Sequence, residues 1–124
     1  MKILFAGLLA VTAAAPAAAQ KMNAEDFHRR ADALHRKGSR ALLAMGEIRA
    51  LTKEVRAAGE LIRARRIAAE KAGEKPRYCP PKGTSRRMGT EEFMNRLSAI
   101  PRPERQAIDM AEAMNRILAT KHPC

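Results

Sequence analysis

Residues 44–72 read AMGEIRALTKEVRAAGELIRARRIAAEKA, and they carry the clearest helical pattern in the chain. Its apolar side chains recur at alternating spacings of four and three: Ala44, Ile48, Leu51, Val55, Ala58 and Ile62. This spacing places one continuous apolar stripe along a helix. The opposite side carries charge, at Arg49, Lys53, Arg56 and Glu60. The pattern therefore predicts a long amphipathic helix that packs on the rest of the chain.

Glycine is the weak point of this predicted helix. Gly59 lies inside it, and glycine in a helix costs about 1 kcal/mol relative to alanine. A kink or a break at Gly59 therefore stands beside a continuous helix as an alternative. Gly73 and Pro76 end the helical pattern.

The segment before the long helix predicts a shorter one. Asn23 is a suitable N-cap, and acidic residues follow it in the first turn, where they complement the helix dipole. Gly38 fits a C-terminal stop, and Ser39 is a candidate cap for the long helix.

Residues 75–89 are a loop by composition, and two further helices are predicted after it. Thr90 is a candidate cap for the first, which would bury Phe93 and Leu97. Pro101 breaks this helix, and Pro103 suits the first position of a last helix that ends at His122. No segment shows sustained alternation of period two. The sequence thus predicts an all-α domain of about four helices.

The N-terminus has the layout of a secretory signal peptide. Lys2 is followed by an apolar run over residues 3–11, then Pro16 and three small residues ending at Ala19. The apolar run is too short for a membrane span, which needs about 20 residues. We expect cleavage near Ala19, a mature domain of residues 20–124 without a transmembrane segment, and a periplasmic or secreted location.

Two cysteines are present, Cys79 and Cys124. An even number of cysteines in an exported chain favours a disulfide, and closing this loop would contribute about 4 kcal/mol in the chain-entropy model. A metal site and two free thiols are the alternatives, although the ligand spacing suits zinc poorly.

The formal net charge is +11, and it is unevenly distributed. Residues 53–87 hold eleven basic and four acidic side chains, whereas residues 88–124 hold five of each. A cationic zone favours acidic proteins, lipid headgroups or other polyanions, unless it serves only as a solvated face. Nucleic acid is not an expected partner outside the cytoplasm.

No motif in the sequence predicts catalysis, a cofactor or a metal site. His28, Asp32 and His35 share one helical face, but the basic residues beside them would repel a cation. Cys79 lies before two prolines and lacks an activating base. Met88, Met94, Met110 and Met114 are most simply core and loop filler. We therefore predict that the protein is not an enzyme.

The C-terminal segment carries a family resemblance. It reads Cys79-Pro80-Pro81-Lys82-Gly83-Thr84, followed by a helix, then Ile100-Pro101, then an alanine-rich helix ending in His122-Pro123-Cys124. This order resembles the C-terminal half of the Rap/Tai family of type VI secretion immunity proteins. The upstream cysteine pair common in that family is absent. The resemblance implies a periplasmic, helical, often dimeric inhibitor that blocks a cell-wall-degrading effector by direct binding.

The cationic zone is the expected docking surface for such an effector. Its candidate binding residues are Arg63, Arg65, Arg66, Lys82, Arg86 and Arg87. The alternative is a basic envelope or stress protein that binds polyanions or anionic membrane surfaces. Steep loss of affinity with added salt would distinguish this alternative from a specific inhibitor.

Overall fold

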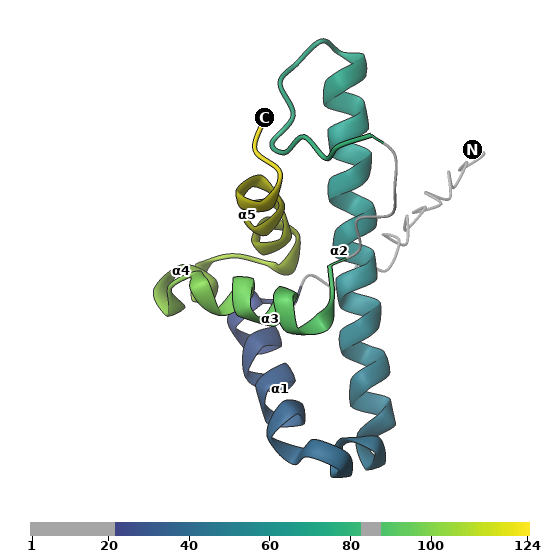
Figure 1. Cartoon of the computed structure of the whole chain (residues 1–124), viewed down its shortest axis with the longest axis vertical. Coiled ribbons are helices and arrows are strands. Elements are labelled where there is room, and N and C mark those ends of the chain that lie inside the picture. Colours follow the sequence, from purple (N-terminus) through teal and green to yellow (C-terminus); the bar gives the residue numbers. More distant parts are fainter. Residues whose placement is uncertain (1–21, 83–87) are drawn as a thin grey trace, which may run out of the picture.

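The computed structural model describes residues 22–82 and 88–124 (Figure 1). Its elements, in chain order, are α1 Ala24–Lys37, the 3-10 helix η1 Gly38–Ala44, α2 Met45–Lys71, α3 Thr90–Ala99, α4 Arg102–Ala107 and α5 Met110–Lys121. Within these described ranges there is no strand, and the one β-type pairing is an isolated bridge between Asn23 and Asp109. The predicted all-α fold is confirmed. The predicted signal peptide, residues 1–19, lies outside the described residues.

α1 and α2 form a helical hairpin joined by η1. The Asn23 side chain accepts hydrogen bonds from the backbone N–H groups of Glu25 and Asp26, at 2.9 and 3.2 Å, which confirms the predicted N-cap. Gly38 ends α1 with φ at 56°, a left-handed conformation that glycine adopts without a Cβ clash.

The predicted cap at Ser39 is wrong. The chain enters a 3-10 helix at Gly38, so Ser39 lies inside η1 and α2 begins only at Met45. Ala44 occupies the N-cap position of α2, and it makes no side-chain cap hydrogen bond. Gly89, not Thr90, is likewise the N-cap residue of α3.

α2 runs unbroken through Gly59 for 27 residues, about 40 Å at 1.5 Å per residue. The predicted stripe is its buried face: Leu51, Ala58 and Ile62 are at most 7% exposed. A Cβ built at Gly59 would meet no atom within 4 Å, so neither packing nor backbone geometry requires glycine there. The alternative of a break at Gly59 does not occur.

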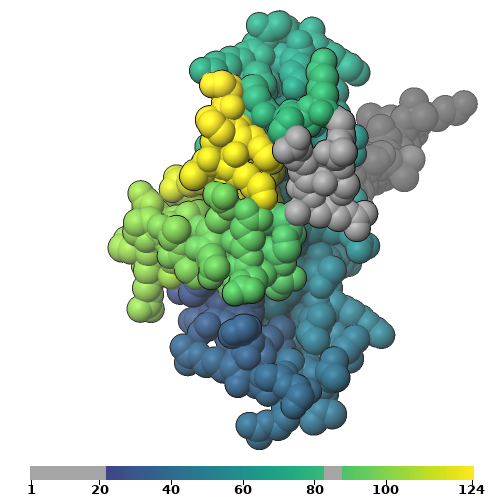
Figure 2. Space-filling view, in the orientation of Figure 1, coloured from purple at the N-terminus to yellow at the C-terminus, as the bar shows by residue number. Residues whose placement is uncertain are grey.

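The remaining helices cover one side of α2. α5 packs along α2, and α3 and α4 cross the N-terminal end of α1 (Figure 1). Ile62, Leu97 and Met110 are the largest fully buried side chains, contributed by α2, α3 and α5. Phe27 meets Phe93 edge to face with ring centroids 6.0 Å apart. Figure 2 shows the upper and lower parts of the molecule packed as one continuous body.

The predicted last helix is divided into α4 and α5, so the prediction of one helix from Pro103 to His122 is wrong. Ile108 and Asp109 are extended because they pair with the start of α1. Ala24 N–H donates to the Ile108 carbonyl at 3.0 Å, and Met110 N–H donates to the Met22 carbonyl at 2.9 Å. The Asp109 side chain then caps α5 by accepting from Glu112 N–H at 2.8 Å. A contact across more than eighty residues overrides the local helical pattern.

A covalent brace joins the segment after α2 to the end of α5. Cys79 and Cys124 form a disulfide, as predicted. Cys79 N–H donates to the His122 carbonyl at 2.9 Å beside it. Arg77 pairs with Glu112 of α5 through both guanidinium NH groups. The brace fixes the C-terminus against the body of the fold.

Candidate binding face

Of the six basic residues predicted to bind a partner, the four that the structure describes do not share one face. Arg63 and Arg65 are both exposed on α2, but residues two apart on a helix point about 200° apart around its axis. Lys82 is exposed in the segment that follows α2. Arg86 and Arg87 lie outside the described residues. Only Arg63 belongs to the side of α2 that faces away from the core.

Arg66 has a structural role. Its guanidinium lies over the Tyr78 ring, 5.5 Å from the centroid, and its Nη1 is 3.0 Å from a Glu70 carboxylate oxygen. Tyr78 is 5% exposed, so this cation–π contact shields part of the core beside the brace. Arg66 therefore supports the orientation of α2 and has little surface left for a partner.

The outer side of α2 carries a row of exposed cations. We call Arg49, Lys53, Arg56 and Arg63 the α2 basic face. Their spacings of four, three and seven place them on one side of the helix, opposite the buried stripe. In the part of the chain that the structure describes, none of them forms an ion pair. In Figure 1, α1, α3 and α5 all lie on one side of α2, and the four basic side chains are exposed.

Sequence reasoning placed Arg49, Lys53 and Arg56 on the outer side of the helix but left them out of the candidate site. The apolar stripe could have identified them, because its angular position around the helix axis also fixes which residues lie on the opposite face. Choosing basic residues by local charge density instead selected Arg65 and Arg66, which point elsewhere.

A buried ion pair joins α1 to α4. Arg105 Nε lies 2.8 Å from a Glu25 carboxylate oxygen, and both side chains are about one-tenth exposed. Arg105 also donates to the backbone carbonyls of Ser98 and Ile100 at the end of α3. Its guanidinium thus connects three helices, and it is fully engaged in structural contacts.

Two of the three residues considered as metal ligands on α1, His28 and Asp32, each contact a different neighbour. His28 Nε2 lies 2.9 Å from the Ser98 hydroxyl oxygen, and burial followed by the charge of Arg105 lowers the pKa of His28. Asp32 pairs with Arg36 at 2.9 Å. Across residues 22–82 and 88–124, no three His, Cys, Asp or Glu side chains gather closely enough to hold a metal ion.

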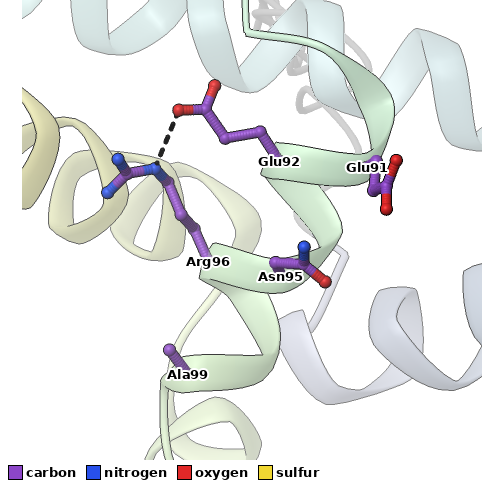
Figure 3. A pocket seen from close by; sticks show the side chains of 5 residues that line it. All are labelled: Glu91, Glu92, Asn95, Arg96 and Ala99. Carbon is purple, nitrogen blue, oxygen red and sulfur yellow. Dashed lines mark hydrogen bonds and ion pairs between the residues drawn. The ribbon is translucent and has the colours of Figure 1, made fainter.

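An open depression lies along α3, lined by Glu91, Glu92, Asn95, Arg96 and Ala99. Figure 3 shows Glu92 reaching towards Arg96, with Glu91 and Asn95 on another side of the helix. Lys121 donates to both Glu92 oxygens, at 2.7 and 2.8 Å, and this hydrogen bond holds the pKa of Glu92 below its ordinary value. The carboxylate is therefore ionised and occupied by neighbours, which suits an interhelical clamp better than acid–base chemistry.

Among the helices the structure describes, none combines the length and the apolar character that crossing a bilayer requires. Comparisons with protein-family models, with curated proteins and with solved structures found no match to this chain. The surface geometry and the chemistry of its residues therefore carry the functional argument.

Proposed function

We propose that this protein is a periplasmic binding protein of the immunity type, which inhibits a cell-wall-degrading effector by docking through the α2 basic face. The observation that carries the proposal is the row of four exposed cations without ion-pair partners in the described structure. Neighbouring cations repel one another, and an acidic partner relieves this repulsion while its approach is accelerated by the field.

Rigidity supports a binding role. A surface that is already ordered loses less conformational entropy on association than a flexible one. α2 is held at several points along its length: Arg30 clamps Glu47 near its start with contacts of 2.5 and 2.7 Å, and Arg66 stacks on Tyr78 near its end. The disulfide fixes the segment that follows. The four cations therefore project from a preorganised rod.

Direct blocking fits the shape of this face. The four cations extend over about 21 Å of α2, at 1.5 Å per residue, and a helix face of that length can lie across a cleft and cover the groups inside it. A cell-wall hydrolase with acidic residues at its substrate cleft offers charge complementary to Arg49, Lys53, Arg56 and Arg63. The resemblance of residues 79–124 to Rap/Tai immunity proteins points to the same class of partner.

Affinity capture tests this proposal. The tagged chain is exported to the periplasm of its own species, and captured proteins are identified and counted against the bait. We expect one partner at fixed stoichiometry that hydrolyses peptidoglycan, and loss of its activity on adding the purified chain. A paired variant, K53E/R56E, should capture much less of it.

The envelope-protein alternative gives a different result in the same assay. A general polyanion binder captures many anionic molecules, and its yield falls steeply as salt is raised. Recovery of such a mixture, or of a hydrolase whose activity the chain leaves unchanged, would refute the inhibitor proposal.

A further inference from the structure

The end of the molecule opposite the brace has the properties of a membrane-docking surface. We define the η1 tip as residues 36–46, which join α1 to α2 at the bottom of Figure 1, far from the C-terminus. Leu42, Leu43 and Met45 in this tip are 70, 89 and 43% exposed, and they are the large apolar side chains identified as exposed in the described structure. A cluster of exposed large apolar side chains calls for an explanation, whereas a single exposed leucine does not.

In an ordinary packed helix the largest apolar side chains point towards the core, and in η1 they point to solvent. Residues three apart eclipse one another on a 3-10 helix, and Ala41 and Ala44 form the half-buried side of η1. The two leucines between them point to solvent. The segment thus places its smallest apolar residues inwards and its largest outwards, so folding of this chain gains little from either leucine.

Cations surround these apolar side chains. Arg36, Lys37 and Arg40 are exposed, and residues 36–46 contain no Asp or Glu. Arg36 pairs with Asp32 at 2.9 Å, and Glu47 pairs with Arg30. Lys37 and Arg40 form no ion pair in the part of the chain that the structure describes, so they carry the net positive charge of the tip. Apolar side chains ringed by basic ones match the interface of an anionic bilayer, where leucine enters the acyl boundary and arginine meets the phosphates.

A second copy of the chain fits the tip less well. A stable protein interface uses about 20–30 residues on each side, whereas the tip offers three exposed large apolar side chains on a projecting turn. Two such tips would also bring the cations Lys37 and Arg40 of each copy together. A lipid surface has neither problem, because it accepts a small convex element and supplies negative charge.

From these observations we infer that the protein docks on anionic lipid bilayers through the η1 tip, with Leu42 and Leu43 inserted and Lys37 and Arg40 at the headgroups. Docking by the tip leaves the α2 basic face available, since that face runs along the side of the molecule. This inference is independent of the proposed inhibitor function, because the two surfaces use different residues.

Vesicle co-sedimentation tests the inference. The protein is purified from the periplasmic fraction with its disulfide intact, its N-terminus is defined by mass, and it is mixed with phosphatidylcholine vesicles with or without phosphatidylglycerol. We expect binding that needs phosphatidylglycerol. L42S/L43S should weaken it by about tenfold or more, and R40Q by about fivefold.

Two controls make the outcomes decisive. R63Q/R65Q removes two cations far from the tip and should retain most of the binding, whereas a purely delocalised charge effect would make it weaker than R40Q. Circular dichroism of each variant confirms folding. Equal binding by L42S/L43S and the parent would overturn the inference. So would absence of binding to phosphatidylglycerol vesicles, or self-association that L42S/L43S abolishes without lipid.

Discussion

The buried Glu25–Arg105 pair gives the sharpest stability prediction. The substitution Arg105→Met keeps an unbranched apolar stem and removes the guanidinium with its charge. It leaves the Glu25 carboxylate, about 10% exposed, without its partner at 2.8 Å. It also removes the donor to the Ser98 and Ile100 carbonyls. Breaking a buried pair by deleting one member costs about 3–5 kcal/mol.

The chain supplies a matched control for this experiment. Arg102 approaches the same carboxylate at 3.9 Å, but its side chain is 69% exposed. Solvent screening reduces such a contact to about 0–1 kcal/mol. Arg102→Met should therefore have little effect, although it removes the same charge from the same helix.

Urea denaturation followed by circular dichroism measures both variants. We expect R105M to lower the unfolding free energy by at least about 3 kcal/mol, or the midpoint temperature by about 12 °C or more. Adding Glu25→Gln to R105M should recover part of this loss, because the orphaned charge is then gone. Equal stabilities for R105M and R102M would refute the argument that burial makes this ion pair important.

Three further predictions follow from the scaffold. Gly59→Ala should raise the unfolding free energy by about 0.5–1 kcal/mol, since α2 is continuous there and the site is open; a lower urea midpoint would contradict this. Reducing the Cys79–Cys124 disulfide should cost about 4 kcal/mol in urea titrations, and finding two alkylatable thiols in the native protein would contradict the brace. Stability should fall as pH falls, because the folded-state pKa values of several groups are lowered and the unfolded chain then binds more protons. The loss should begin near the ordinary pKa of 6.5 for His28 and steepen below 4.5, where the unfolded chain takes up protons that the paired carboxylates of the folded protein do not yet bind; a flat urea midpoint from pH 7 to 3 would be the contrary result. These carboxylates are Glu47, Glu92 and Glu112.

Much of the fold was predictable because its helices are encoded locally. The apolar stripe of α2 and the Asn23 cap depend on residues within a few turns of one another. The disulfide was predictable from an even number of cysteines together with the predicted export signal. The division between α4 and α5 was not predictable in this way. It depends on residues 22–24 pairing with residues 108–110, which no local pattern reveals.

The candidate site was harder to predict than the fold. Arg63 and Arg66 look equivalent in the sequence, yet one faces solvent and the other stacks on Tyr78. The position of Tyr78 depends on the path of the chain after α2 and on the disulfide beside it. Leu42 and Leu43 likewise give no sign in the sequence that η1 would leave them exposed. The net charge predicts a cationic surface, but which cations share a face depends on the tertiary structure.

We propose that the α2 basic face binds and inhibits a cell-wall hydrolase. The most direct test is the inhibition constant of the chain against the captured hydrolase, measured by peptidoglycan release. We predict that K53E/R56E raises this constant at least about tenfold, because like charges would then meet across the interface. R65E/K75E changes the net charge equally at exposed positions off this face and should leave the constant nearly unchanged. Equal effects of the two double variants, or no effect of K53E/R56E, would contradict the claim.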